Sequence, residues 1–183
     1  MDHNIASRII VIGSTGAGKT TAARQIAASR SLPFVELDAL HWNSGWVPAP
    51  RELFRERVAG ALAGERWVAD GNYSRVRDLV WPRAELLVWL DYELPVLLWR
   101  LLKRSIWRVA TREQLWNGNR ETLRGQFFDR DSLFVWALRS HARHRAEWQA
   151  ALAQPEHAHL QVVRLRTPAA AEGWMGSLTR ASL

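Results

Sequence analysis

Residues 13–20 carry the sequence feature that most restricts how this chain can fold. They read GSTGAGKT and match the pattern G-x-x-x-x-G-K-[ST]. The β-branched run at 8–12 predicts a buried strand before this motif, and good helix-forming residues follow from 18 to about 30. Glycines between a strand and a helix let backbone N–H groups turn inward, and the helix N-terminus adds partial positive charge. The motif therefore predicts a phosphate-binding loop, and an ordinary glycine-rich turn is the alternative interpretation.

The side chains of this loop have the chemistry that a nucleotide needs. Lys19 can reach the β- and γ-phosphates, Thr20 can ligate Mg²⁺ through its hydroxyl, and Thr21 can contact the α-phosphate. Lys19 and Lys103 are the only lysines among 25 lysines and arginines. This usage supports a specific role, because arginine cannot replace a compact ammonium group in such a loop. The residues expected to bind the nucleotide are Gly13, Ser14, Thr15, Gly16, Ala17, Gly18, Lys19, Thr20 and Thr21.

Length and composition predict one globular domain. Residues 1–183 are 48% hydrophobic and 23% charged, and they contain no repeat, low-complexity tract or long linker. Cysteine is absent, which excludes disulfides and fits a reducing cytoplasm. No signal sequence precedes the first strand, and the longest apolar stretch, 86–102, contains charged residues that exclude a membrane span. We therefore expect a cytoplasmic protein with no membrane partner and with most of its 11 tryptophans in the core.

The formal net charge of +7 leaves three interpretations open. A basic chain can bind nucleic acid or an anionic membrane surface. Many arginines can instead neutralise the phosphates of a nucleotide, or they can be solvated residues that reflect a compositional bias. The sequence contains no helix-turn-helix or other base-reading motif. Any nucleic-acid binding is therefore expected to be weak, non-specific and driven by the phosphate backbone.

Strand and helix patterns alternate along the chain, which predicts a parallel sheet with helices on both faces. Helices are expected from 18 to about 30, 53 to 62, 95 to about 112, 132 to about 153 and from 168 onward. The expected strands are 8–12, 33–37, 67–69, 85–90 and 160–165. The expected fold class is α/β, with a three-layer α/β/α architecture around a five-stranded parallel sheet.

Aspartates follow three of these strands, at the edge where open α/β sheets bind ligands. Asp70 can hold Mg²⁺ or orient an acceptor hydroxyl, and closing the turn before Gly71 is its alternative role. Asp38 precedes an acceptor-side loop, about 39–50, that contains aromatic residues. This carboxylate can accept the proton of a substrate hydroxyl, and a helix cap is its alternative role. Asp91 is expected to serve a loop or a cap.

Arginines recur every four residues along the expected helix from 95 to about 112, which places them on one helix face. These residues are Arg100, Arg104, Arg108 and Arg112. The stripe leads into an arginine-rich segment, about 112–131, that can close as a lid and neutralise the charge of a transferring phosphoryl group. Arg112, Arg120 and Arg124 are the lid candidates, and an ordinary solvated helix face is the alternative interpretation.

Several motifs together resemble a known group of kinases. The GSTGAGKT loop is similar to the phosphate-binding loops of adenylate, shikimate and gluconate kinases, and Asp70-Gly71 resembles the start of the adenylate kinase motif Asp-Gly-Phe-Pro-Arg. Asp38 resembles the strand-two aspartate that binds acceptor hydroxyls in shikimate kinases. With LDALHW at 37–42 and WNGNRE at 116–121, the chain looks like the bacterial adenylate-kinase-related proteins often labelled DNA topology modulation proteins.

This resemblance covers about residues 8–167 and implies a fold, a donor and a reaction. It implies strand order 2-3-1-4-5 in a P-loop kinase-like sheet with a helical lid, and ATP with Mg²⁺ as the phosphoryl donor. The expected activity is transfer of the γ-phosphoryl group of ATP to a small acceptor. The expected catalytic residues are Lys19, Asp70, Asp38, Arg112, Arg120 and Arg124, and the expected metal ligands are Thr20 and Asp70.

Two other functions stay open from the sequence. One is a nucleotide-dependent regulator or ATPase that acts on DNA topology, which the net charge permits. The other is a nucleotide-binding module without catalytic activity. The identity of the phosphoryl acceptor, and the choice between a monomer and a homodimer, are not determined by the sequence.

Overall fold

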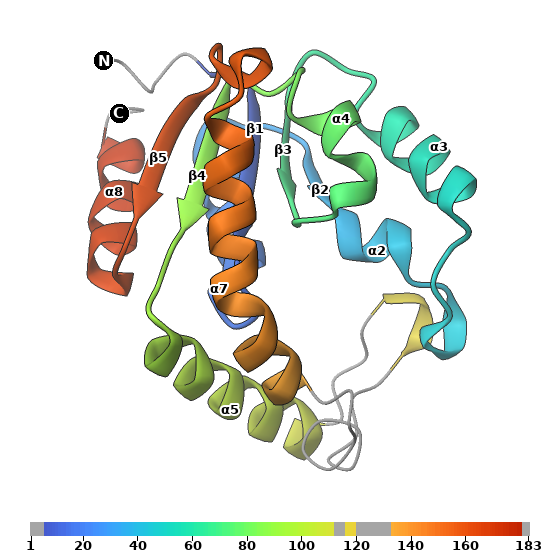
Figure 1. Cartoon of the computed structure of the whole chain (residues 1–183), viewed down its shortest axis with the longest axis vertical. Helices are drawn as coiled ribbons and strands as arrows, with labels where there is room; N and C mark the ends of the chain where they lie inside the picture. The colour runs from blue at the N-terminus through green and yellow to red at the C-terminus, as the bar shows by residue number, and fades with distance from the viewer. Residues whose placement is uncertain (1–5, 112–115, 120–132, 181–183) are drawn as a thin grey trace.

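A five-stranded parallel sheet runs through the centre of the computed structural model, which describes residues 6–111, 116–119 and 133–180 (Figure 1). The strand order is β2-β3-β1-β4-β5, which confirms the predicted α/β class and the order 2-3-1-4-5. The strands are β1 (Arg8–Gly13), β2 (Phe34–Glu36), β3 (Trp67–Asp70), β4 (Leu86–Leu90) and β5 (Gln161–Leu165). Because every pairing is parallel, the carboxyl ends of the strands lie at one edge of the sheet.

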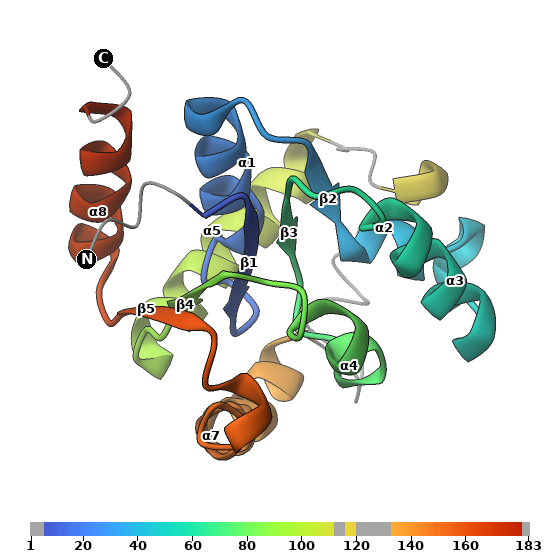
Figure 2. The same ribbon diagram turned by 90° about the horizontal axis from the view of Figure 1, so that it is seen from above.

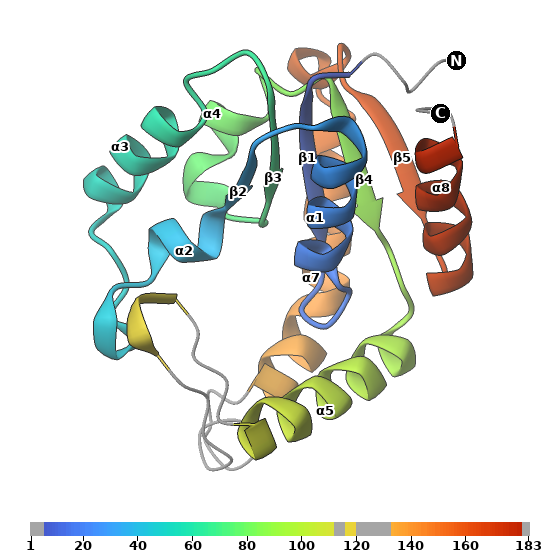
Figure 3. The ribbon, with the colours of Figure 1, turned by 180° about the vertical axis from the view of Figure 1, so that it is seen from behind.

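Helices cover both faces of the sheet, as the view from above shows (Figure 2). One face carries α1 (Lys19–Arg30) and α8 (Pro168–Arg180), and the other carries α3 (Arg51–Ala61), α4 (Arg77–Val80) and α7 (Leu133–Leu152). The helix α5 (Leu94–Thr111) crosses beyond the carboxyl ends of the strands (Figures 1 and 3). The short helices are α2 (Leu37–His41), η1 (Ser44–Trp46), η2 (Ser74–Val76), η3 (Trp116–Gly118) and η4 (Pro155–His157). None of the described helices is both long and apolar enough to cross a membrane.

Side chains that alternate along β1 build two cores, one beneath each helical layer. Ile9 and Val11 are buried with α1 and α8, whereas Ile10 and Ile12 are buried with α3, α4 and α7. A central strand that is covered on both faces needs an unbroken apolar run rather than an alternating one. Residues 9–12 have this character, which is why the sequence predicted the strand correctly.

The expectation that most tryptophans lie in the core is wrong. Among the described tryptophan side chains, four are buried, and these are Trp67, Trp81, Trp89 and Trp148. Two tryptophans of α5, Trp99 and Trp107, are 57% and 58% exposed. Because α5 crosses the end of the sheet, it buries only the face that is turned toward the sheet.

The prediction for the second strand and the segment after it is partly wrong. The strand ends at Glu36, and the helix α2 begins at Leu37, so Asp38 lies in a helix and the start of the expected loop is helical. Leu37 explains the difference. Its side chain is 1% exposed and packs against Gly71, where an added Cβ would lie 2.9 Å from the Leu37 Cβ. The helical turn buries Leu37 there and leaves Asp38 within electrostatic reach of Lys19.

Most of the candidate lid lies outside the described residues. Of the segment from about 112 to 131, the structure describes 116–119. Arg112, Arg120 and Arg124 fall on residues that are not described, and their roles stay predictions.

Candidate functional site

The loop between β1 and α1 has the backbone geometry of an anion-binding turn. Gly16 and Gly18 have positive φ angles of 85° and 89°, and α1 begins at Lys19, directly after Gly18. The loop is also tightly packed, because a Cβ at Gly16 would lie 2.7 Å from the Leu97 carbonyl oxygen of α5. Both conformation and packing therefore require glycine at Gly16. The first N–H groups of α1, which have no partners within the helix, lie beside it.

Lys19 folds back over this loop. Its Nζ donates a hydrogen bond to the Ser14 carbonyl oxygen at 3.3 Å. Burial lowers the pKa of Lys19, whereas the charges of Asp38 and Asp70 raise it. The ammonium group is therefore within electrostatic reach of two carboxylates as well as in contact with the phosphate-binding loop.

Thr20 and Asp70 meet where the loop approaches β3. Thr20 Oγ1 donates a hydrogen bond to Asp70 Oδ2 at 2.6 Å. Asp70 is 3% exposed, and its Oδ1 is buried without a hydrogen-bond partner among the described residues. Burial raises the pKa of Asp70 to about 7, although the Thr20 hydrogen bond and the charge of Lys19 lower it. A hydroxyl beside an unsatisfied carboxylate oxygen is a set of hard oxygen donors that suits Mg²⁺.

Glu36, the last residue of β2, is a site residue that the sequence motifs did not identify. Its Oε1 lies 3.5 Å from Thr20 Oγ1, and its Oε2 pairs with Arg24 at 3.2 Å. Glu36 stands beside Asp70 in the β2–β3 register, so its place at a strand end is the signal that could have found it. In the part of the chain that the structure describes, no three metal-ligating side chains form a metal site by themselves. A cation here would complete its coordination with phosphate and water oxygens.

Asp38 is held by the loop that follows β3. Tyr73 Oη donates a hydrogen bond to Asp38 Oδ1 at 2.5 Å. The Tyr73 ring also packs against His41 and Phe54, with centroid distances of 4.6 and 5.0 Å. Burial raises the pKa of Tyr73, and the charge of Asp38 raises it further, so the phenol remains a donor at neutral pH. The structure therefore gives Asp38 a fixed partner while its charge still acts on Lys19.

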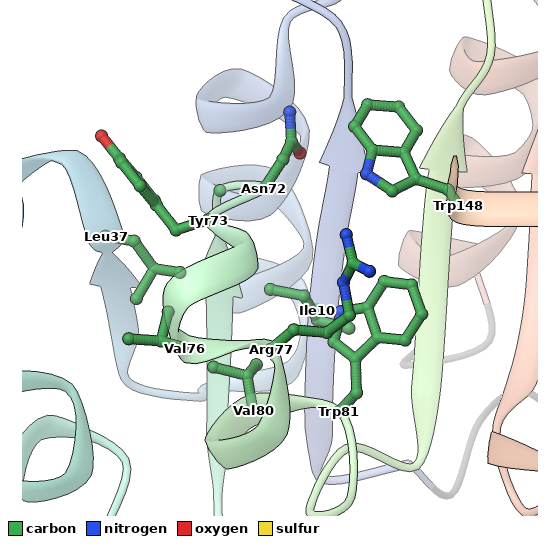
Figure 4. A pocket seen from close by; sticks show the side chains of 10 residues that line it. Ile10, Leu37, Asn72, Tyr73, Val76, Arg77, Val80, Trp81 and Trp148 are labelled. Carbon is green, nitrogen blue, oxygen red and sulfur yellow. The ribbon is translucent and has the colours of Figure 1, made fainter. Parts of the chain in front are cut away.

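Asn72 joins the same loop to the phosphate-binding loop. Its Oδ1 accepts a hydrogen bond from the Gly13 N–H at 3.1 Å, and its Nδ2 donates to the Gly13 carbonyl oxygen at 2.6 Å. Asn72 and Tyr73 leave the loop in different directions, beside a cavity lined in part by Arg77 and Trp148 (Figure 4). The cavity measures about 10 Å³, which is room for one water molecule and not for a substrate.

The acceptor-side loop is tied to the described part of the candidate lid, 116–119. The Trp46 N–H donates to Asn119 Oδ1 at 3.0 Å, and Asn119 Nδ2 donates to the Asn43 carbonyl oxygen at 2.9 Å. The Trp116 ring packs edge-on against Trp46 with a centroid distance of 6.2 Å. The hydrogen-bonded residues are 73 and 76 positions apart in the chain, so sequence alone gave no signal for this contact.

Two arginines of α5 interact with the phosphate-binding loop, one through a hydrogen bond and one through its charge. Arg100 Nε donates to the Gly16 carbonyl oxygen at 3.2 Å, and the charge of Arg104 lowers the pKa of Lys19. On the other side of α5, Ile106 is 54% exposed. The arginine stripe therefore begins at the loop, and a purely solvated face is the wrong interpretation for Arg100 and Arg104. The four-residue spacing predicted a common face, and the packing of α5 on the loop determines where that face points.

Asp91 does not join Asp38 and Asp70. It is 4% exposed, and its Oδ2 accepts hydrogen bonds from Arg145 at 3.0 Å and from Arg164 at 2.7 Å. These ion pairs connect the end of β4 to α7 and β5. The sequence placed an aspartate after three strands, and the structure brings two of the three to the phosphate-binding loop.

Three solved kinase structures share this fold. The chain is similar to a shikimate kinase from Acinetobacter baumannii in complex with shikimate, with a TM-score of 0.54, 19% identity, and 97% of this chain and 94% of that chain covered. A shikimate kinase from Bacteroides thetaiotaomicron matches with a TM-score of 0.53 and 19% identity, and the match covers 96% of this chain and 98% of that chain. A gluconokinase from Sinorhizobium meliloti 1021 matches with a TM-score of 0.51 and 20% identity, and the match covers 97% of this chain and 89% of that chain. No protein-family model and no curated protein matches the chain. At these identities, the likeness shows the fold of P-loop shikimate and gluconate kinases.

Proposed function

We propose that this protein transfers the γ-phosphoryl group of Mg-ATP to a small acceptor that carries a hydroxyl group. The observation that carries the proposal is the 2.6 Å contact between Thr20 Oγ1 and Asp70 Oδ2, beside a buried Asp70 oxygen without a partner among the described residues. A buried polar atom of this kind needs an explanation, and a cation bound with a nucleotide supplies one. The glycine-rich turn before Thr20 supports the proposal, because a turn of this conformation at the start of a helix suits phosphate oxygens.

On the donor side, the loop of residues 13–20 holds the phosphates through its N–H groups, and Thr21 contacts the α-phosphate. Lys19 leaves its Ser14 contact to bind β- and γ-phosphate oxygens. Mg²⁺, held by Thr20 and Asp70, neutralises phosphate charge when it is bound. The protein's own contribution is to fix the phosphates in line with the acceptor and to exclude water.

Arginines complete the positive charge around the transferring group. Arg100 contacts the phosphate-binding loop, and Arg104 acts on Lys19 from the same helix. The lid residues Arg112, Arg120 and Arg124 follow this helix in the chain, and in this proposal they reach the same phosphates. Guanidinium groups suit this role because they form bidentate hydrogen bonds with phosphate oxygens.

On the acceptor side, Asp38 binds the acceptor hydroxyl and accepts its proton. The acceptor oxygen forms a new bond to the γ-phosphorus while the bond to the β–γ bridging oxygen breaks, and ADP leaves with that electron pair. A positioned carboxylate contributes by taking the proton as this happens. The neighbours are named as shikimate kinase and gluconokinase, and a small hydroxylated acceptor is in keeping with those names.

A transfer assay with ATP labelled on its γ-phosphate tests this proposal. The assay compares nucleosides, nucleotides, sugars and hydroxy acids as acceptors, with and without a chelator. We expect Mg²⁺-dependent transfer to at least one class, and a loss of about 100-fold or more in Asp38→Asn. Asp78→Asn is the matched control, because Asp78 is an exposed carboxylate whose side chain pairs with Arg55. Binding of ATP without transfer to any acceptor would instead favour the regulator or ATPase alternative.

A further inference from the structure

Residues 70–73, here called the strap, connect three parts of the site that are far apart in the chain. The strap follows β3 directly and reads Asp-Gly-Asn-Tyr. Three of its four side chains each bind a different partner. The pairs are Asp70 with Thr20, Asn72 with Gly13, and Tyr73 with Asp38. The strap thus contacts the proposed metal ligand, the phosphate-binding loop and the proposed acceptor carboxylate.

The remaining strap residue, Gly71, allows the strap to pack closely against its neighbours. Its φ is 137°, and its N–H donates to the Val11 carbonyl oxygen of β1 at 3.2 Å. A Cβ at this position would lie 2.9 Å from the Cβ of Leu37, the first residue of α2. The strap is therefore packed between β1 and α2. In a close-packed contact of this kind, a shift at one end is passed to the other.

Asp38 depends on the strap because its own helix is short. The helix α2 spans five residues, Leu37–His41, and among the described residues no side chain caps its N-terminus. A single helical turn is marginal without tertiary support. The hydrogen bond from Tyr73 and the packing of its ring on His41 supply that support from outside the helix.

Asn72 acts on the donor side in a comparable way. Its amide group offers the Gly13 peptide one acceptor and one donor, as a neighbouring peptide would. This pairing fixes the first residue of the phosphate-binding loop relative to Asp70, two positions before Asn72. The strap therefore sets the spacing between the loop and the carboxylate of the proposed metal site.

We propose that Asn72 and Tyr73 are positioning residues through which nucleotide binding orders the acceptor carboxylate. A nucleotide bound at Asp70 and the phosphate-binding loop restrains the strap. The Tyr73 hydrogen bond to Asp38 then restrains Asp38 and α2. The inference rests on the proposed function, since it takes the loop of residues 13–20 as the nucleotide site. Because such coupling is reciprocal, an acceptor bound at Asp38 tightens nucleotide binding by the same factor.

Amide hydrogen exchange of residues 37–46 tests the coupling without a known acceptor. In the wild-type protein we expect Mg-ADP to slow exchange in this segment by about 10-fold, within the range usual for coupled sites. Tyr73→Phe removes one hydroxyl and keeps the ring. This variant should bind Mg-ADP within about 3-fold of the wild-type Kd and yet lose most of the protection. Tyr92→Phe, which removes the other phenolic hydroxyl of the chain, should keep the protection.

The outcomes separate this inference from the proposed function. If wild-type protein binds Mg-ADP but exchange at 37–46 is unchanged, or if Tyr73→Phe is protected as well as wild type, the coupling is wrong. If wild-type protein does not bind Mg-ADP, the proposed function itself fails. Should Tyr73→Phe fold poorly, Asp38→Ala removes the same hydrogen bond from its other partner. That variant should lose the same protection, and full protection in it would also overturn the coupling.

Asn72→Asp tests the donor end of the strap. The substitution preserves shape but places an oxygen where Nδ2 donates to the Gly13 carbonyl, so it replaces an attraction with a repulsion. We expect Mg-ADP affinity to fall by about 10-fold, with Asn72→Gln as a partial rescue that keeps the amide donor. Equal affinity in wild type and Asn72→Asp would remove Asn72 from this account.

Discussion

The donor side and the acceptor side of this site are built in different ways. The proposed donor side is one contiguous loop, residues 13–20, whose conformation depends on glycines with positive φ angles that tolerate close packing. The acceptor side joins three segments, 37–46, 70–73 and 116–119, through side-chain hydrogen bonds and ring contacts. A contiguous loop leaves a motif in the sequence, whereas a site assembled from distant segments does not.

This difference predicts how each side responds to substitution. The donor loop is packed against α5, so an added atom there disturbs the fold as well as the nucleotide site. The proposed acceptor side has partly exposed aromatic rings, and within the described part of the chain no atom lies within 4 Å of a Cβ added at Gly45. Changes on the acceptor side should therefore alter specificity and local order more than global stability.

Asp70→Asn should produce the largest effect and should separate function from stability. Loss of the charged oxygen is expected to lower Mg²⁺-dependent turnover by about 1,000-fold, because the carboxylate supports metal-bound phosphates. In ligand-free protein the same change should raise the free energy of unfolding by about 1–2 kcal/mol at pH 8, since it removes a buried charge with an unsatisfied oxygen. Denaturant unfolding beside a turnover assay measures both effects.

The pH dependence of that stability gain has a definite sign. Burial raises the pKa of Asp70 to about 7 in the folded state, above its value of about 3.9 in an unfolded chain. The folded state therefore binds this proton more tightly, and wild type loses stability as the pH rises from about 4 to 7. Asn does not titrate, so the advantage of Asp70→Asn should shrink at pH 5. An advantage that grows toward acid pH would contradict the burial of this carboxylate.

A matched pair of glycine substitutions compares the two sides directly. Gly16→Ala combines a positive φ of 85° with a clash at 2.7 Å from the Leu97 carbonyl oxygen, and should cost about 3 kcal/mol. Gly45→Ala has a positive φ of 73°, but no atom of the described residues lies within 4 Å of the added Cβ, and the change should cost about 1 kcal/mol. Thermal or chemical denaturation gives both values. Equal costs would mean that packing does not distinguish the donor loop from the acceptor loop.

Asn119→Ala should loosen the acceptor side alone. It removes two hydrogen bonds, from the Trp46 N–H and to the Asn43 carbonyl oxygen, and should cost about 1 kcal/mol or less of global stability. Hydrogen exchange should become faster in residues 42–46 and stay unchanged in residues 13–20. Faster exchange in both segments would show that the Asn119 contacts, in addition to the strap, connect the acceptor side to the donor loop.

The smallest expected effect is binding to DNA. The net charge of +7 predicts weak association through phosphates, with log affinity falling linearly with log salt concentration. Titrations of unrelated DNA sequences at several salt concentrations would measure it. Tight, sequence-selective binding at physiological salt would support the regulator alternative over the kinase.

The sequence predicted the centre of the sheet because β1, β3 and β4 are buried on both faces and read as mostly apolar runs. The run at 8–12 and the motif at 13–20 together placed the phosphate-binding loop, and the resemblance supplied the strand order. The end of the second strand was misplaced because β2 has only three residues and lies at the sheet edge, where burial of Leu37 overrides strand propensity.

The sequence did not predict the hydrogen-bond partners of the candidate site residues. The sequence predicted Asp38 and Asp70 as candidate carboxylates after strands. No sequence pattern predicted a role for Asn72 or Tyr73, which follow Asp70. Their contacts exist because β3 lies between β1 and β2, so a loop leaving β3 can reach Gly13 on one side and Asp38 on the other. That adjacency is a property of the fold and not of local sequence.

Nucleotide-dependent stabilisation tests the central claim most directly. Mg-ATP at 100 times its Kd should raise the free energy of unfolding by about 2.7 kcal/mol. Lys19→Ala should lose most of this gain, and a chelator should reduce it in wild type. Lys103→Ala is the matched control, because it removes the other lysine of the chain from an exposed position on α5 and should keep the full effect. No stabilisation of wild type at millimolar Mg-ATP, or equal stabilisation of Lys19→Ala, would contradict the assignment of residues 13–20 as the nucleotide site.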